Sequence, residues 1–272
     1  MTPRPAHFTA LDGGYLPSPF AQSHWGEDHL NGPAVVGLAA RALESAHGSG
    51  DFMPARLTVD LFKAARGVHT TVTTRLLRDG RRVRNAECEV SQNGVTVAHA
   101  VIVFYRRSSA PPGEQWTAQT HFEFPDGFDH DEESTTPYTG SDERGWTRKV
   151  SDHQNASRTR FLDSGIEVVA GEPNTPFVRA AMLAESTSLT THLGSSGIGY
   201  INGDLTVGLA RLPVDGWIGV QADSHWAADG VAVGSATLFD NIGPFGTGMV
   251  TAVANPAAQI DFGAETFKGM RI

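Results

Sequence analysis

An acidic side chain on the apolar face of a predicted helix is the feature of this sequence most suited to chemistry. Within residues 174–192, apolar side chains recur at the spacing of one helix face, at Val178, Ala181, Met182 and Leu189. Glu185 lies on the same stripe, three residues after Met182 and four before Leu189. A carboxylate removed from water costs several kcal/mol unless it is hydrogen-bonded or used in function.

Two interpretations of Glu185 are open. If the helix face is buried, the pKa of Glu185 is raised, and a carboxylate that titrates near neutrality suits a general base that takes a proton from water. If the helix is only half buried, Glu185 lies at its rim and is solvated. The stripe fits both interpretations, so the surrounding elements have to decide between them.

The elements around Glu185 are predicted to be a helix, a glycine-rich turn and a long strand. Asn174 suits the helix cap and Pro176 its first turn, where a missing N–H costs nothing. Glycines at 194, 197 and 199 end the helix and turn the chain back. In the strand at 199–211, apolar and polar residues alternate, as expected of a sheet with one face against a helix.

The first half of the chain has the same plan. Residues 1–30 are expected to be irregular, and a helix is predicted at 31–46 with Asn31 and Pro33 at its start. Strands are then predicted at 56–62, 68–77, 81–92 and 95–107, with hairpins at Asp79-Gly80 and Asn93-Gly94. Strands of the second half are predicted at 199–211, 216–227, 231–240 and about 245–254.

Three anchors recur in the same order in the two halves, and they predict an internal duplication. The pairs are Asn31-x-Pro33 with Asn174-x-Pro176, Leu57-Thr58-Val59 with Leu205-Thr206-Val207, and Asp79-Gly80 with Asp229-Gly230. Their separations are 143, 148 and 150 residues. We therefore divide the chain into a first repeat at 1–107, an acidic, proline-containing linker at 108–144 and a second repeat at 145–272. Three phenylalanines suggest that part of the linker is pinned down, namely Phe122, Phe124 and Phe128.

Composition excludes several classes of protein. The 272 residues suffice for one large core or two small ones, and the single cysteine, Cys88, excludes an internal disulfide. A net charge of −9 argues against general nucleic-acid binding. Arginines crowd one hairpin, where a solvated strand face is the favoured interpretation and phosphate binding the alternative; they are Arg75, Arg78, Arg81, Arg82 and Arg84.

The sequence also predicts location and cofactor use. No apolar run approaches the roughly 20 residues that span a bilayer, and the start of the chain lacks the apolar core of a signal peptide, so we expect a cytoplasmic protein without membrane contact. His24 and His29 lack further ligands at matching spacing, so no metal is expected. Nucleotide-binding glycine motifs and the G-x-S-x-G elbow are missing, so no cofactor and no serine nucleophile of that type are expected.

Several motifs resemble those of one family. HLNGPAVVGLAARALE, PARLTVDLFKAA, TPFVRAAMLAE, GIGYINGDLTVGLAR and DGVAVGSATLFD are similar to segments of the medium-chain, type II acyl-CoA thioesterases, and more so to their actinobacterial relatives. The similarity covers most of residues 20–255. It implies an α+β, double hot-dog fold, in which each of two fused repeats is a long helix wrapped by an antiparallel sheet.

The resemblance also implies a set of site residues. Type II enzymes position the hydrolytic water with an Asp, a Thr and a Gln of the second half. The Asp falls at Glu185, the Thr at Asn202, and the Gln at Thr251, or at Val250 when aligned to the actinobacterial relatives. Two of the three positions therefore differ in type. Strict alternation turns Asn202 away from the helix, and only an irregularity near Gly203 would bring it to Glu185.

Substrate contacts are expected at the entrance of the first helix. By resemblance, backbone N–H groups around Asn31 and Gly32 could polarise the thioester carbonyl, with simple helix capping as the alternative. Trp25 could line an acyl tunnel, with packing under a loop as the alternative.

The leading hypothesis is an acyl-CoA thioesterase. One alternative is a non-catalytic protein that binds acyl-CoA or a related acyl thioester. Another is a hot-dog hydratase or dehydratase, which would need a histidine on a helix stripe, and we identify none. Pairing of outer strands could form a homo-oligomer.

Overall fold

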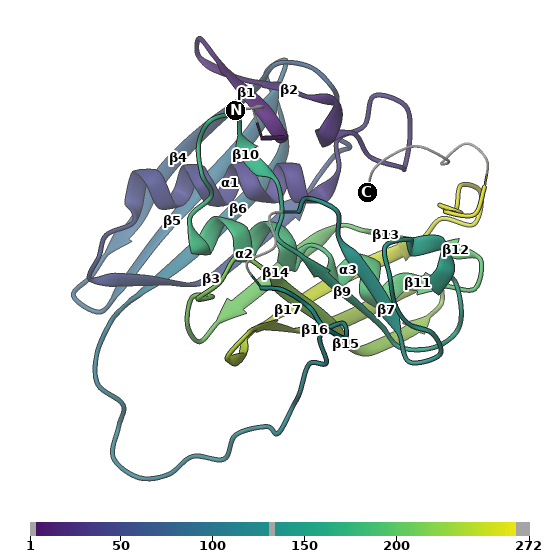
Figure 1. The fold of residues 1–272 in the computed structure, drawn as a ribbon. Coiled ribbons are helices and arrows are strands. Elements are labelled where there is room, and N and C mark those ends of the chain that lie inside the picture. The colour runs from purple at the N-terminus through teal and green to yellow at the C-terminus, as the bar shows by residue number, and fades with distance from the viewer. Residues whose placement is uncertain (1–3, 131–133, 265–272) are drawn as a thin grey trace.

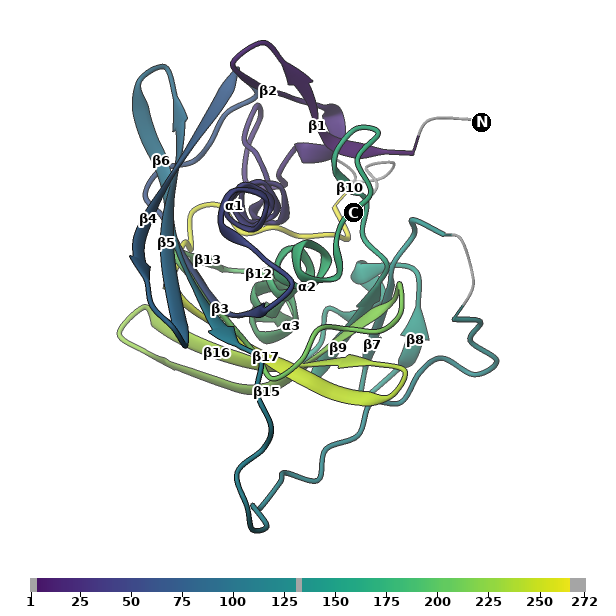
Figure 2. The same cartoon turned by 90° about the vertical axis from the view of Figure 1, so that its left-hand side faces the viewer.

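The computed structural model describes residues 4–130 and 134–264. A long curved sheet surrounds three helices, α1 (Gly32–His47), α2 (Pro176–Ala184) and α3 (Thr187–His192). Figure 2 views these helices nearly end-on, with the sheet curving around them. The core joins the apolar faces of α1 and α2 to the inner face of the sheet. The arrangement is the α+β architecture that the sequence predicts.

Each helical segment is followed by four main antiparallel strands. After α1 these are β3 (Phe52–Leu61), β4 (Thr70–Asp79), β5 (Val83–Gln92) and β6 (Val95–Arg106). After α3 they are β14 (Asp204–Leu209), β15 (Ile218–Ala228), β16 (Val231–Asp240) and β17 (Gly243–Ala254). The orders across the sheet are β4-β5-β6-β3 and β15-β16-β17-β14, so the strands of each half follow one scheme.

Strands β3 and β14 join the two halves into one sheet (Figure 1). Thr58 faces Thr206, and their hydroxyl oxygens lie 3.0 Å apart. Leu57 pairs with Val207 and Val59 with Leu205, and all four of these apolar residues are fully buried. The two Leu-Thr-Val segments recognised in the sequence are therefore direct antiparallel neighbours.

The expectation that residues 1–30 are irregular is wrong in part. Residues Ala6–Leu11 form β1, Gly14–Pro17 form β2, and Pro19–Ala21 form a 3₁₀ turn, η1. Strand β1 pairs in parallel with β10 (Glu167–Val169) and buries Phe8 completely. These strands are short, and β1 pairs with a strand of the second half. Local periodicity therefore does not predict them.

The helix boundaries also differ from the prediction in two respects. Asn31 caps α1 as expected, its Oδ1 accepting from the N–H of Ala34 at 2.8 Å. The second helix is capped by Thr175 instead of Asn174. The side chain of Asn174 accepts a hydrogen bond from the N–H of Val168 and donates one to the carbonyl of Ile166. The helix is also interrupted after Ala184, so the predicted single helix is α2 followed by α3.

The segment predicted as a linker is partly structured. Residues 107–130 form a long excursion without helix or strand (Figure 1), but Phe122 is buried and packs with Phe124, Trp146 and Phe239. The end of the segment forms a strand that pairs with β9. The elements here are β7 (Tyr138–Ser141), β8 (Gly145–Thr147), η2 (Val150–His153) and β9 (Thr159–Asp163).

Three very short strands connect α3 to β14. They are β11 (Leu193–Gly194), β12 (Gly197–Ile198) and β13 (Tyr200–Asn202). Strands β11 and β12 form a small separate hairpin, whereas β13 pairs with β17. No helix in the described ranges is long and apolar enough to cross a membrane.

Two arginines of the arginine-rich hairpin form ion pairs with acidic side chains. Arg75 lies in an ion pair with Glu87 across β4 and β5, and Arg84 lies in one with Asp79 at 2.9 Å. Arg75 is largely exposed. These contacts agree with a solvated strand face, whereas phosphate binding at the hairpin remains a hypothesis.

Glycines in β16 and β17 let α3 lie close to the sheet. A Cβ added at Gly248 would overlap Oγ1 of Thr187, a buried hydroxyl without a hydrogen-bond partner among the described residues. The Gly248 backbone is outside the left-handed region, so alanine is allowed there by the backbone and excluded only by its neighbour. The helix–sheet distance therefore depends on small residues in these strands.

We predict that Gly248→Ala lowers the free energy of unfolding by about 1–3 kcal/mol, because the added methyl group overpacks the contact with Thr187. Adding Thr187→Ala removes the overlapping hydroxyl and recovers most of the loss. Gly208→Ala on β14 is the matched control, because the Cβ added there would lie 4.0 Å from its nearest neighbour, Cγ2 of Thr247. Urea unfolding measures all four proteins. Equal stability of the Gly248 and Gly208 variants would contradict this account of the packing.

Candidate active site

Glu185 lies at the C-terminal end of α2, at the break before α3, and is 8% exposed. It is therefore buried, and the rim interpretation is wrong. Its Oε1 accepts a hydrogen bond from Nδ2 of Asn202 at 3.0 Å. This bond gives the buried carboxylate one of the polar partners that it needs away from water.

The N-terminus of α1 lies directly against this carboxylate. A Cβ added at Gly32 would overlap Oε1 and the carboxyl carbon of Glu185, so glycine is required for the close approach. The side chain of Asn31 is engaged in holding this turn, because its Nδ2 donates to the carbonyls of Phe20 and Gln22. Of the two residues predicted at the helix entrance, Gly32 thus touches the candidate base and Asn31 caps the helix.

Asn202 reaches Glu185 because the strand is irregular at Gly203, as expected from the alternation of the strand. Asn202 pairs with Ala252 of β17, but Thr206 pairs with Met249, so one extra residue separates the pairs on the β13–β14 side. The Oδ1 of Asn202 accepts from the hydroxyl of Ser188 at 3.1 Å. Ser188, three residues after Glu185, was not predicted, although helical spacing places it on the neighbouring turn.

Thr251 is not hydrogen-bonded to Glu185. Its hydroxyl and its backbone N–H both donate to the carboxylate of Asp204, each at 2.6 Å. The adjacent Val250 is fully buried and apolar. The structure thus brings Asn202 to the carboxylate, whereas Thr251 forms a separate pair with Asp204.

Trp25 packs in a small cluster beside the β11–β12 hairpin. The cluster consists of Val150, Leu193, Ile198 and Ile260, with Trp25, Leu189 and Phe262 packed against it. This environment agrees with the packing alternative for Trp25. Its role in binding an acyl chain remains a prediction.

Burial raises the pKa of Glu185 to about 7, and the hydrogen bond from Asn202 acts in the opposite direction. A carboxylate with this pKa is present in its basic form at neutral pH and still accepts protons there. The pKa is raised because burial removes the charged form of Glu185 from water. The arrangement therefore suits proton abstraction from a bound water.

The statement that no histidine lies on a helix stripe is wrong. His192, at the end of α3, is 5% exposed, and neither ring nitrogen has a hydrogen-bond partner in the part of the chain that the structure describes. Burial lowers its pKa to about 4, and the nearby His225 adds to this effect. Its ring packs against Tyr200 and His225. The spacing of Glu185, Leu189 and His192 was a signal for its burial.

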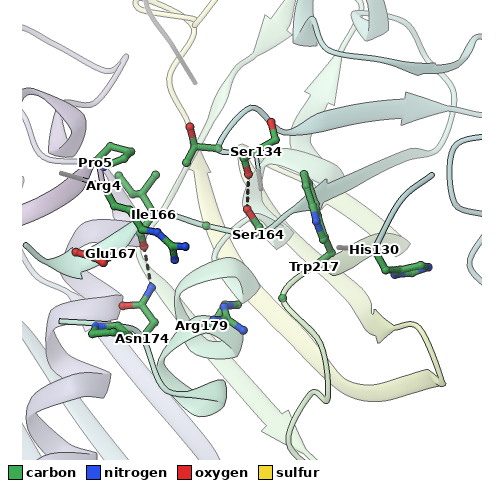
Figure 3. A pocket seen from close by; sticks show the side chains of 14 residues that line it. Arg4, Pro5, His130, Ser134, Ser164, Ile166, Glu167, Asn174, Arg179 and Trp217 are labelled. Carbon is green, nitrogen blue, oxygen red and sulfur yellow. Dashed lines mark hydrogen bonds between the residues drawn. The ribbon is translucent and has the colours of Figure 1, made fainter. Parts of the chain in front are cut away.

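A cavity of about 380 Å³ lies at the opposite end of α2 (Figure 3). Ser164, Asn174, Arg179 and Trp217 are among the residues that line it, and Glu185 is not. An acyl tunnel that leads to Glu185 remains a prediction, and this cavity is a separate feature.

Comparison with known families places the chain in one of them. Residues 21–105 match the acyl-CoA thioesterase N-terminal domain, and residues 107–253 match the acyl-CoA thioesterase C-terminal domain. The chain therefore belongs to the acyl-CoA thioesterase family. Comparison with curated proteins gave no match.

Solved structures share the fold at low sequence identity. A Novosphingobium aromaticivorans protein assigned as a thioesterase is 17% identical, with a TM-score of 0.67 over 92% of this chain and 98% of its own. A hot-dog protein of unknown function from Alicyclobacillus acidocaldarius is 15% identical, with a TM-score of 0.65 over 91% and 96%. The acyl-CoA thioesterase II TesB2 of Mycobacterium marinum is 14% identical, with a TM-score of 0.61 over 92% and 96%. These similarities identify the hot-dog fold.

The raised pKa of Glu185 predicts a pH dependence of stability. Between pH 4.5 and 7 the unfolded chain loses this proton before the folded chain does, so the native state is destabilised as pH rises through that window. Glu185→Gln removes the titration and keeps an oxygen for Asn202. We expect its stability relative to wild type to increase from pH 4.5 to pH 8 by up to about 3 kcal/mol.

Urea unfolding at several pH values measures this difference. Glu143→Gln, at an exposed position, is the control for loss of one charge. A wild-type-minus-variant difference that stays constant across the window would show that Glu185 titrates normally.

Proposed function

We propose that this protein hydrolyses an acyl-CoA thioester to the free acid and CoA, with a water activated by Glu185 and without a cofactor. The observation that carries the proposal is the buried Glu185 carboxylate, with a pKa near 7, against the start of α1 in a chain of the acyl-CoA thioesterase family. Membership alone leaves the chemistry open, because a fold hosts several activities. The site residues supply the specific argument.

In the proposed reaction, Glu185 takes a proton from water as the water oxygen attacks the thioester carbonyl carbon. Because Asn202 donates to Oε1, we assign Oε2 as the oxygen that accepts the proton in this proposal. The backbone N–H of Gly32 would stabilise the developing oxyanion, whereas that of Asn31 already donates to the carbonyl of Ala21 at 2.7 Å. Collapse of the tetrahedral intermediate breaks the carbon–sulfur bond, and the CoA thiolate receives the proton. Asn202 acts as a positioning residue that orients the carboxylate.

We also propose that the fold is a double hot dog, with repeats at 1–107 and 145–272 and a linker between them. Support comes from the shared strand order of the two halves and from the separate matches of residues 21–105 and 107–253. The two helix entrances differ in one respect that bears on activity. At the sequence separation of 143, Thr175 corresponds to Gly32, and its hydroxyl bonds to Glu44 of α1. A side chain thus occupies in one half the space that glycine leaves open in the other.

The alternative is a protein that binds an acyl thioester and does not cleave it. It is favoured by the buried, apolar Val250 at one alignment of the family glutamine and by the pairing of Thr251 with Asp204. A water beside Glu185 would then have fewer polar partners. The hydratase alternative is not favoured, because His192 contacts Tyr200 and His225 instead of a carboxylate.

Release of free thiol from a panel of acyl-CoAs tests the function. We expect wild type to release thiol and Glu185→Gln to lose about 10²–10⁴-fold in kcat, the usual contribution of a general base. Glu143→Gln should retain wild-type activity. Binding of acyl-CoA by wild type without thiol release would support the binding protein and contradict the hydrolase.

The pKa of Glu185 sets the expected pH profile. Because the carboxylate must be ionised to accept a proton, kcat/KM should rise as pH increases and level off above about 7. The rise should be tenfold per pH unit well below that value. A profile that is already flat from pH 5 to 8 in an active wild-type enzyme would exclude Glu185 as the base.

A further inference from the structure

The cavity at the N-terminal end of α2 is built from segments that are distant in sequence. Its walls come from Arg4 and Pro5, from His130, Ser134 and Thr135, from the segment 164–167 that leads into β10, from the start of α2, and from Gly216 and Trp217 before β15 (Figure 3). Its volume of about 380 Å³ is within the range of small-molecule sites. The activity proposed above does not use it.

Two neutral polar side chains that line this cavity, Asn174 and Ser164, are already hydrogen-bonded within the protein. Both ends of the Asn174 amide are used, by the N–H of Val168 and the carbonyl of Ile166. The hydroxyl of Ser164 donates to the carbonyl of Ser134 at 2.7 Å. These bonds hold the walls in place and leave the specificity to the charged groups.

Two described acidic residues in or beside the cavity, Glu167 and Asp215, each accept a hydrogen bond within the protein. Glu167 accepts from the N–H of Gly171 at 2.7 Å. Asp215, behind the cavity wall, lies 3.3 Å from the ring of His130 and accepts from the N–H of Asn241. Among the described residues, neither of these two carboxylates forms an ion pair with Arg179.

Arg179 differs from these groups because most of its hydrogen-bond donors have no partner within the described residues. It is half-buried on α2, and its one hydrogen bond within the described residues runs from Nη1 to the carbonyl of Asp215 at 3.1 Å. Burial lowers its pKa; Asp215 opposes this effect and the neighbouring Arg4 adds to it. A guanidinium offers five N–H donors in a fork that matches an oxyanion, so most of its donors are uncommitted. Pro173 and Asn174, which precede α2, line the same cavity.

We propose that this cavity binds a small molecule through an oxyanion, a carboxylate or phosphate group, held by Arg179. The site is distinct from the proposed reaction centre. Arg179 precedes Glu185 by six residues, about 9 Å along the helix axis. Glu185 is not among the residues that line the cavity. Binding at one site does not require the chemistry of the other.

Thermal unfolding with added sodium phosphate or sodium acetate tests the proposal, with sodium chloride at equal ionic strength as the reference. At ten times the dissociation constant, we expect phosphate, acetate or both to raise the Tm of wild type by about 2–4 °C. The more effective anion identifies the oxyanion. Arg179→Gln should abolish the rise, whereas Arg107→Gln, the same charge change at an exposed position after β6, should retain it.

Thr135→Trp provides a second variant that leaves Arg179 intact and fills the rim, because Thr135 is an exposed lining residue. It should also abolish the rise, and titration calorimetry on wild type should give one site per chain. The proposal is overturned if neither anion raises the Tm of wild type above the chloride reference. It is also overturned if the rise is the same in wild type and in Thr135→Trp.

Discussion

The contact between the Glu185 carboxylate and Gly32 is the constraint on which the rest of the site depends. It brings the start of α1 to the end of α2, and any side chain at Gly32 would displace the carboxylate. The burial that results raises the pKa of Glu185. The same contact puts the backbone of a helix N-terminus, which favours negative charge, next to the candidate base. Packing and chemistry are therefore set by one close approach.

The sheet packs around the helices whose ends form the contact between Glu185 and Gly32. Pairing of β3 with β14 makes one continuous surface around the helices, and the glycines of β16 and β17 allow α3 to lie close to it. The irregularity at Gly203 then turns Asn202 inward, where it bonds to both Glu185 and Ser188. A regular strand would have buried apolar side chains here and left the carboxylate without this partner.

Local patterns in the sequence predicted much of this structure. Asn31 and Pro33 located the start of α1, and alternation with hairpin dipeptides located the eight main strands. Helical spacing placed Glu185 on the apolar stripe and left its burial as one of two interpretations. The need for an irregularity at Gly203 also followed from alternation. These features depend on neighbours within a few residues, which is why periodicity detects them.

Features that depend on distant partners were missed. The short β1 is stabilised by β10, some 160 residues away, and the break after Ala184 interrupts a stripe whose periodicity suggested one helix. Thr251 was assigned by alignment to a family position, yet its hydroxyl bonds to Asp204 on the neighbouring strand. The predicted apolar helix face ended at Leu189 and therefore did not include His192, which lies three residues later. Tertiary contacts decided each of these cases.

The ionisation of Glu185 can be observed directly. Carbon-13 NMR of glutamate-labelled protein, with Glu185→Gln used to assign the signal, follows its carboxyl carbon as pH is changed. Burial raises the pKa of Glu185 to about 7, so the midpoint is expected close to pH 7 instead of near 4.5 as for an ordinary glutamate. A midpoint near 4.5 would mean that the group is solvated, and neither the buried contact with Gly32 nor the base assigned to it would survive that result.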